Sequence, residues 1–338
     1  MKLLYVAVHN QNKGWGAESF LSQSFREIGV ETYCLDFRER RGNLIQEIES
    51  LSDFDCLLLQ RGDYFPISIL KEINCPKFFW ASELVSRNRD QDRLLETDLF
   101  EHIFLHTIGC KKILLKNNKT NKNSYSILLN GFDPKIHYPK AIEKDIDVLF
   151  IGNILSRRRE ILNKIAKTHS LVEAIGVYGD EMVDYINRAK IVLNIHSENF
   201  LDTETRVFEV LACKTFLLSE KLSEDSPFIN GQHLVEVESV DDMISNISYY
   251  LGHNEEREQI AEMGYNEVVA KHTYKERAKV LATLFESFPK NNVKTIPDKF
   301  CLLAYAEQIF LYYKVYLFNK FLNLRSKISQ CIRKQRRR

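Results

Sequence analysis

Two residues three positions apart, Arg206 and Glu209, combine a guanidinium group and a carboxylate on one short stretch of the chain. Residues with this spacing share one face of a helix, so both side chains can reach the same ligand. A guanidinium presents a fork of N–H donors that suits phosphate, and a carboxylate offers two oxygens to a vicinal diol. The pair therefore predicts a site for a ligand that carries both phosphate and a diol.

The segment around this pair, residues 189–220, predicts how the two side chains are positioned. It indicates a buried strand at residues 191–195, a polar loop, a short helix beginning at Asp202 or Thr203, and a second buried strand at residues 215–219. Apolar runs of this kind, with a helix between them, are typical of a parallel sheet covered on both faces. Ligands of such sheets bind at the carboxyl ends of the strands, beside helix N-termini. Asn194 lies at such an end and is a candidate ligand, although a buried asparagine that bonds the sheet edge is an equal alternative.

A second segment, residues 146–159, predicts an anion site. An apolar strand at residues 146–151 is followed by Gly152 and Asn153, and then by a helix that opens with the run Arg157, Arg158 and Arg159. Backbone N–H groups and guanidinium forks converge in such a turn. Three consecutive helical residues fan over about 200°, so they cannot all point inward. We therefore expect Arg157 or Arg158 to contact a phosphate.

The first half of the chain alternates strands and helices in the manner of a doubly wound sheet. A first strand at residues 3–8 is followed by a polar loop that contains Gly14, Trp15 and Gly16, which are candidates to line a cleft. The loop lacks the third glycine of a dinucleotide fingerprint, so turn formation alone is the alternative. Glu83 and His106 follow later strands and are candidate catalytic residues. The alternatives are a helix cap or surface carboxylate for Glu83 and a backbone contact for His106.

Three segments resemble a known family: DVLFIGNILSRRR (residues 147–159), RVFEVLACKTFLLSE (residues 206–220) and HTYKER (residues 272–277). They are similar to the C-terminal domain of GT-B glycosyltransferases of the CgeB-like branch, a spore maturation and glycosyltransferase family 1-like group. The resemblance implies an α/β fold with two facing Rossmann-like domains that contain parallel sheets. It also implies that Glu209 holds the ribose of a nucleotide-sugar donor, and that the last helix of the second domain crosses back to the first.

The resemblance implies a donor site as well, built from Gly152, Asn153, Arg157 or Arg158, Asn194, Arg206 and Glu209. Two positions depart from the family pattern. Lys214 stands where relatives usually have a glycine, in a turn whose left-handed conformation costs a lysine about 1 kcal/mol. Leu201 stands eight positions before Glu209, where many retaining enzymes have an acidic residue, with Glu198 and Asp202 nearby.

The domain organisation follows from a glycine- and proline-bearing segment at residues 130–139. We expect an acceptor domain at residues 1–138, a donor domain at residues 139–288 and a separate tail at residues 297–338. Of the 338 residues, 44% are hydrophobic and 28% are charged, which is typical of a soluble globular protein. The first residues predict a β-strand and not a signal peptide.

The seven cysteines are scattered, without C-x-x-C spacing or histidines at metal-ligand spacing. We interpret them as reduced thiols of a cytoplasmic protein, and we expect no metal and no cofactor.

The tail is basic. From Gln308 onward there are nine Lys or Arg and no Asp or Glu, which leaves 38 bases against 46 acids in residues 1–307, a net charge of −8. Its aromatic and apolar run, residues 300–324, never reaches the ~18 consecutive apolar residues of a membrane-spanning helix. It predicts an amphipathic helix on an anionic membrane surface, a helix packed on the protein itself, or an oligomer contact. The acidic body disfavours nucleic acid as a partner.

Together these features predict a metal-independent glycosyltransferase of the hexosyltransferase type. It would transfer a sugar from a nucleotide-sugar to a hydroxyl group of a glycan that is lipid-linked or belongs to the cell surface. The reaction would take place at the inner face of the membrane. The alternatives are a nucleotide-sugar epimerase of the same fold and a non-catalytic sugar-nucleotide-binding protein of surface assembly.

Overall fold

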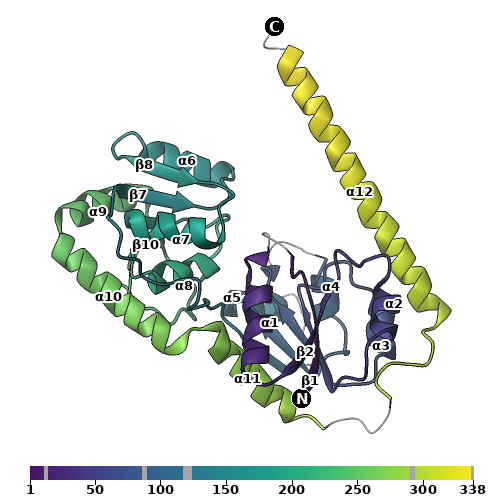
Figure 1. The fold of residues 1–338 in the computed structure, drawn as a ribbon. Coiled ribbons are helices and arrows are strands. Elements are labelled where there is room, and N and C mark those ends of the chain that lie inside the picture. Colours follow the sequence, from purple (N-terminus) through teal and green to yellow (C-terminus); the bar gives the residue numbers. More distant parts are fainter. Residues whose placement is uncertain (11–13, 86–89, 117–123, 290–293, 336–338) are drawn as a thin grey trace.

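Two parallel β-sheets, built by separate halves of the chain, form the framework of the computed structural model (Figure 1). The structure describes residues 1–10, 14–85, 90–116, 124–289 and 294–335. Each sheet is flanked by helices, and its central strands are buried on both faces. This is the α/β architecture with two parallel sheets that the alternation of strands and helices predicts.

The first sheet has six parallel strands in the order β2-β1-β3-β4-β5-β6. The strands are β1 (Lys2–Ala7), β2 (Glu31–Asp36), β3 (Cys56–Gln60), β4 (Lys77–Ala81), β5 (His102–Leu105) and β6 (Ser124–Ile127). The helices between them are α1 (Ala17–Glu27), α2 (Leu44–Glu49), α3 (Ile67–Glu72), α4 (Asp92–Leu95) and α5 (Ile108–Lys116). An apolar cluster covers each face of the sheet, so every residue of β3 is buried.

The second sheet has five parallel strands in the order β11-β10-β9-β7-β8. The strands are β7 (Ile146–Ile151), β8 (Leu171–Ala174), β9 (Ala189–Asn194), β10 (Phe216–Glu220) and β11 (Val235–Val237). The helices are α6 (Ser156–Ile165), α7 (Gly179–Arg188), α8 (Thr205–Ala212), α9 (Val240–Gly252) and α10 (Asn254–Lys271). Two further apolar clusters cover the faces of this sheet.

One part of the second half folds differently from the sequence prediction. A strand and turn are predicted at residues 176–179 and a helix at residues 185–190, but the strand is β8 and the helix is the longer α7. Gly176 and Gly179 have φ of 70° and 58°. Because β-strand residues need negative φ, the glycines make this segment a turn that leads directly into α7.

The end of α8 forms the turn predicted at Lys214, which has a φ of 54°. The Lys214 N–H donates to Leu211 O at 2.9 Å, and the Thr215 N–H donates to Val210 O at 3.3 Å. These two bonds define a Schellman motif, in which a residue with left-handed backbone ends the helix. A lysine therefore occupies a position that glycine fits without steric cost.

The chain crosses between the two halves twice, and the two crossings bond to each other. Phe132 N donates to His272 O at 3.2 Å, and Tyr274 N donates to Phe132 O at 3.0 Å. The Arg277 guanidinium donates to Asn130 O at 3.0 Å. Helix α11 (Tyr274–Glu286) then packs against α1 in the first half (Figure 1). The HTYKER motif therefore holds the two halves together.

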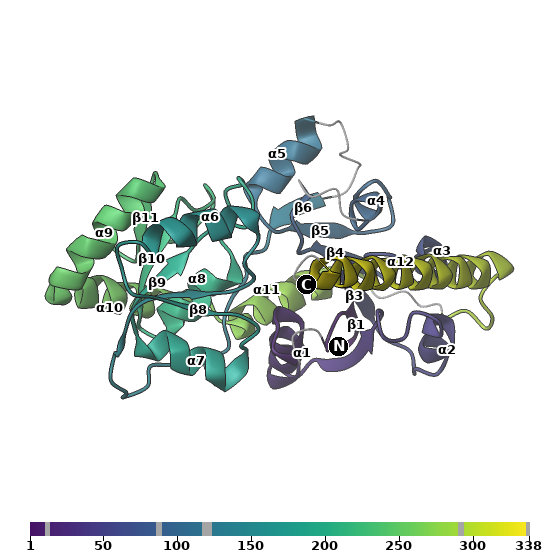
Figure 2. The same cartoon turned by 90° about the horizontal axis from the view of Figure 1, so that it is seen from above.

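Helix α12 (Leu302–Gln335) begins on the outer side of the first half, beside α2 and α3, and then extends past the body of the protein (Figures 1 and 2). Its beginning is anchored by polar groups at two helix N-termini. The Glu307 carboxylate accepts from Ser68 N at 2.8 Å, and Gln308 Oε1 accepts from Ile45 N at 2.9 Å. The first turns of the tail therefore pack on the protein itself, which is one of the three alternatives considered for it. Arg336, Arg337 and Arg338 lie outside the described residues.

Two further observations concern the helices and the cysteines of the described part. No described helix is both long and apolar enough to cross a membrane. Six cysteines have side chains that the structure describes, all with free thiols: Cys34 and Cys301 are exposed, and the other four are buried.

Candidate functional site

A cavity of about 540 Å³ lies between the two halves of the chain. It is lined by residues that follow β1, β3 and β5 of the first sheet and by residues that follow β7 and β9 of the second. The carboxyl ends of both sheets therefore face the same space. This volume is within the range of small-molecule sites, and the position is where α/β sheets bind ligands.

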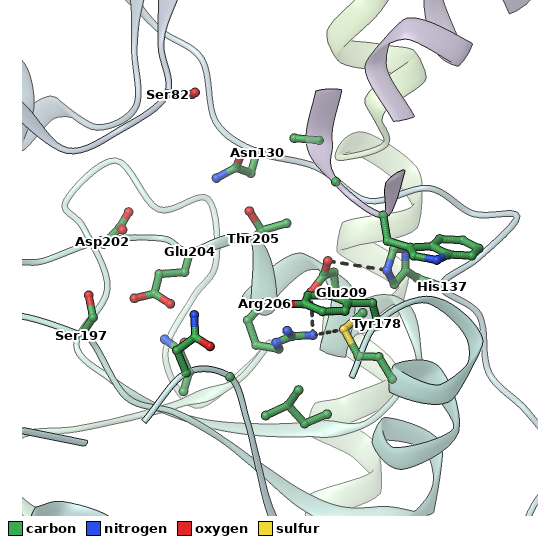
Figure 3. Close-up of a pocket in the computed structure, with 18 of the residues that line it drawn as sticks. Ser82, Asn130, His137, Tyr178, Ser197, Asp202, Glu204, Thr205, Arg206 and Glu209 are labelled. Atoms are coloured by element: carbon green, nitrogen blue, oxygen red, sulfur yellow. Dashed lines mark hydrogen bonds and ion pairs between the residues drawn. The ribbon is translucent and has the colours of Figure 1, made fainter. Parts of the chain in front are cut away.

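Arg206 and Glu209 both line this cavity, on the first turns of α8. The helix begins at Thr205, later than predicted, because Glu204 still has extended backbone with φ of −63° and ψ of 157°. Arg206 Nη1 lies 2.8 Å from Glu209 Oε2, with side chains 19% and 12% exposed. Figure 3 shows the two side chains turned toward each other. The three-residue spacing thus brings the pair together as predicted.

His137, from the crossing segment, completes the surroundings of Glu209. Its Nε2 lies 3.6 Å from Glu209 Oε1 (Figure 3). Burial lowers the pKa of His137, although the Glu209 carboxylate acts in the opposite direction. A neutral imidazole leaves the Glu209 carboxylate available to accept hydrogen bonds from a ligand.

The arginine run of α6 fans out as the helical repeat requires. Arg157 does not line the cavity: its guanidinium bonds Glu220, with Nη1 2.9 Å from Oε2. Arg159 points elsewhere, to the carboxylate of Glu173 at 2.8 Å. Only Arg158 of the three lines the cavity. Of the two predicted phosphate contacts, the structure therefore brings Arg158 to the site and holds Arg157 in an ion pair outside it.

Arg158 is buried and connects the loops around the cavity by hydrogen bonds. Its Nε donates to Ile195 O at 2.7 Å, its Nη1 to Asn153 O at 3.1 Å, and its Nη2 to Glu204 at 3.1 Å. It thereby ties the turn after β7 to the segment before α8. Any contact with a ligand phosphate competes with the Glu204 carboxylate.

The turn after β7 and the end of β9 face the cavity as well. Gly152 has a φ of 146°, a conformation that other residues rarely adopt. Gly152, Asn153 and Asn194 all line the cavity. Asn194 Nδ2 also donates to Ser219 Oγ on β10 at 2.9 Å. The bond to the neighbouring strand is therefore confirmed, and the role of Asn194 as a ligand stays a prediction.

From the first half, Trp15 and Gly16 line the cavity, and Gly14 does not. The φ of Gly14 is 83°, so this glycine serves the turn. Trp15 packs on the second half at Gly179, where an added Cβ would lie 2.6 Å from the indole ring. The loop thus contributes one aromatic ring that bridges the two halves beside the cavity.

Glu83, predicted as a catalytic carboxylate, is not among the cavity-lining residues. Its carboxylate accepts a hydrogen bond from Arg61 Nη1 at 2.7 Å, and Arg61 Nε donates to Glu18 at 2.7 Å. Glu18 and Arg61 do line the cavity, and Glu18 is only 3% exposed. Glu83 therefore contacts the cavity through Arg61, and its catalytic role stays a prediction.

Sequence reasoning missed Glu18 and Arg61 as site residues. A signal existed for Arg61, which directly follows strand β3 in the polar run Gln60–Asp63. Its φ of 66° is a conformation that non-glycine residues hold mainly where the surrounding structure enforces it. For Glu18, the signal was its place in the first turn of α1, directly after the glycine loop.

His106 follows β5 and lines the cavity, as predicted, and it meets a residue of the other half. Its Nε2 lies 2.7 Å from Asp202 Oδ1, and both side chains are less than 9% exposed. Burial alone would lower the pKa of His106, but the charge of Asp202 and its hydrogen bond raise it above the ordinary value. A buried pair of an imidazole and a carboxylate therefore spans the two halves at the cavity.

Neighbouring contacts continue this interface. Ile108 N donates to Asp225 Oδ2 at 3.1 Å, and the Lys112 ammonium lies 2.6 Å from Glu224. Figure 2 shows α5 at the edge of the first half that faces the second.

The residue at the retaining-enzyme position, Leu201, is 42% exposed, whereas Glu198 and Asp202 line the cavity.

The described residues contain no group of three or more His, Cys, Asp or Glu side chains placed to hold a metal ion. The arginines that line the cavity are Arg61, Arg158 and Arg206.

Residues 144–283 match a protein family described as glycosyl transferase-like. The match covers the second sheet, including the Gly152 turn, Arg206 and Glu209. It is broader than the CgeB-like branch, which stays a prediction. No curated protein matches the chain.

Among solved structures, the chain resembles Anabaena HepE in complex with UDP-glucose, with a TM-score of 0.65 and 10% identity. The match covers 85% of this chain and 100% of HepE. Sucrose-phosphate synthase from Thermosynechococcus elongatus gives a TM-score of 0.64 at 10% identity, covering 85% and 98% of the two chains. BGT of T4 phage, solved with UDP and Mn²⁺, gives 0.56 at 14% identity, covering 85% and 100%. The chain therefore has the GT-B fold of two facing Rossmann-like domains.

Proposed function

We propose that this protein is a glycosyltransferase that moves a sugar from a nucleotide-sugar donor to a hydroxyl group of an acceptor. The observation that carries the proposal is one cavity in which Gly152, Arg206 and Glu209 of the second domain face His106 of the first. The glycosyl transferase-like match of residues 144–283 supports the reaction class. The complex of HepE with UDP-glucose supports a nucleotide-sugar as the donor.

The donor binds on the second domain in this proposal. Glu209 accepts hydrogen bonds from the two ribose hydroxyls, because it is the buried carboxylate beside a neutral His137. Arg206, one turn earlier on α8, and the open backbone of the Gly152 turn meet the diphosphate. The N-terminus of α8 adds unpaired N–H groups on the same side. Asn194 completes this half of the site at the end of β9.

Transfer requires that the nucleoside diphosphate leaves with its charge stabilised. We propose that Arg206, supported by Arg158, supplies positive charge to the departing phosphates as it develops. In this scheme no metal is required, and activity persists in the presence of a chelator. A requirement for Mn²⁺ or Mg²⁺ would overturn that part of the proposal and leave donor binding by Glu209 intact.

The acceptor binds on the first domain, where Trp15, Glu18 and Arg61 line the cavity. A buried carboxylate and a guanidinium beside an aromatic ring suit the hydroxyls and apolar face of a sugar ring. His106 is the proposed catalytic residue, since its imidazole reaches the cavity and Asp202 fixes its orientation at 2.7 Å. Glu83 orients Arg61 instead of acting on the acceptor directly.

The proposal also covers the type of sugar, the acceptor and the compartment. The sugar is a hexose, and the acceptor is a glycan of the cell surface or of a lipid carrier. The free thiols, four of them buried, favour a reducing compartment, so we place the protein in the cytoplasm.

The test follows a labelled sugar. The protein is incubated with UDP-glucose labelled in the glucose, with and without candidate glycan acceptors, and UDP release is measured together with transfer of the label. Acceptor-dependent transfer that His106→Ala reduces at least a hundredfold, with donor affinity retained, supports the proposal. His253→Ala, which changes an exposed histidine outside the cavity, serves as the matched control.

Other outcomes separate the alternatives. An isomerised nucleotide-sugar without transfer would identify an epimerase. Donor binding without turnover for any acceptor would identify a sugar-nucleotide-binding protein. Because the donor base is an assumption, the same panel includes the nucleotide-sugars of adenosine, guanosine and cytidine.

A further inference from the structure

Helix α12 carries a long apolar face that no described residue covers. Leu303, Phe310, Tyr313, Leu317, Phe321 and Leu324 follow one another at steps of three, four and seven residues, and each is between 56% and 65% exposed. Such steps place side chains on one side of a helix. The face runs for about 32 Å along the axis, given a rise of ~1.5 Å per residue. An apolar surface of this extent marks a binding site for another apolar surface.

The opposite side of the helix is docked on the protein, which fixes where the apolar face points. Ala304, Gln308 and Leu311 are at most 7% exposed and lie on one side of the helix. Gln308 bonds Ile45 N and Gly42 O, so the docked side cannot rotate without breaking buried hydrogen bonds. The exposed face is therefore held away from the body of the protein.

The charge of α12 indicates which kind of partner binds its apolar face. After Glu307 the sequence has nine basic residues and no acidic one. Lys314, Lys320 and Arg325 belong to the described part of the apolar segment, interspersed with its aromatic and leucine side chains. Pairing with α12 of a second copy would bring these positive charges together with no carboxylate between them, which is unfavourable. An anionic apolar partner fits both the charge and the hydrophobicity.

We propose that α12 is a membrane-surface helix that binds anionic lipid. Its apolar face enters the boundary between headgroups and acyl chains, while its lysines and arginines contact headgroup phosphates. The first domain, to which α12 is anchored, is then held beside the bilayer, where a lipid-linked acceptor resides. The inference rests on α12 alone and does not depend on the proposed reaction.

The experiment is flotation of the full chain with two kinds of vesicle, phosphatidylcholine alone and phosphatidylcholine mixed with phosphatidylglycerol. We expect binding to the anionic vesicles only, weakened by salt. The variant L317S/F321S should bind at least tenfold more weakly, because two apolar side chains no longer leave water. The variant K314Q/K320Q/R325Q should lose roughly a hundredfold, from about fivefold for each base near an anionic surface.

The control is I175S/V280S, which removes two apolar side chains that are 56% and 59% exposed but lie on other elements. It should bind vesicles like the unchanged chain, and thermal unfolding checks that all variants fold. No flotation of the unchanged chain, or an equal loss in the control, would overturn the proposal. So would a dimer in sedimentation velocity without lipid that L317S/F321S converts to monomer, because a second copy would then be the partner.

Discussion

The role of Glu209 can be tested by removing its carboxylate and comparing two ligands, UDP and UDP-glucose. If Glu209 holds the ribose, its loss removes charge-assisted hydrogen bonds, which contribute about 1.5–3 kcal/mol. Glu209→Ala should therefore weaken binding roughly 10- to 150-fold. Since the ribose is common to both ligands, the factor should be the same for UDP and for UDP-glucose.

The contact between Glu209 and Arg206 affects the size of this loss. Glu209 is already paired with Arg206 at 2.8 Å, so a ligand must share or displace that contact. Glu209→Gln keeps one acceptor oxygen and loses the charge, and we expect it to weaken binding about fivefold, a difference of ~1 kcal/mol. Removing the Glu209 carboxylate leaves the Arg206 guanidinium, which is 19% exposed, without this partner, so the free energy of unfolding should fall by about 1–3 kcal/mol.

Isothermal titration calorimetry measures both affinities, and Glu173→Gln is the matched control. Glu173 is a carboxylate of the same domain that pairs with Arg159 away from the cavity. Affinities unchanged in Glu209→Ala would refute the donor site as built here. A loss confined to UDP-glucose would refute the ribose contact and assign Glu209 to the sugar instead.

Three other predictions concern the turn after α8, the ion pair between His106 and Asp202, and the contact between Trp15 and Gly179. Lys214→Gly should raise the free energy of unfolding by about 0.5–1 kcal/mol by relieving the left-handed backbone, whereas Lys214→Ala, which keeps the Cβ, should give no gain in thermal or denaturant unfolding. Because the pKa of His106 is raised in the folded protein, its pair with Asp202 stabilises fully below about pH 6.5 and loses that stabilisation as pH rises through the raised pKa. The difference in unfolding free energy between the unchanged chain and Asp202→Asn should accordingly shrink above about pH 6.5, and a difference independent of pH would contradict the ion pair. Gly179→Ala should displace the indole of Trp15 and shift its fluorescence to longer wavelength, and since Trp80 is fully buried, an unshifted spectrum would argue against the contact.

Much of the fold was predictable because it depends on neighbouring residues. The apolar runs predict the parallel strands, and the predicted bounds of the strand at Ile146–Ile151 agree with the structure. The left-handed turn at Lys214 was implied by the resemblance, because relatives usually have a glycine at that position. Where a prediction failed, as at residues 176–179, two glycines with positive φ outweighed the apolar residues between them.

For the site, the sequence by itself determined what one helix or one turn controls. Arg206 and Glu209 meet because a three-residue spacing fixes their relation on α8, and Gly152 supplies an open backbone because it has no Cβ. Only the tertiary structure decided which of the consecutive arginines faces the cavity. It also decided that Arg61 separates Glu83 from the cavity and that His106 finds Asp202 in the other domain. These contacts join residues distant in sequence, so they depend on how the two sheets pack, which no local pattern of residues encodes.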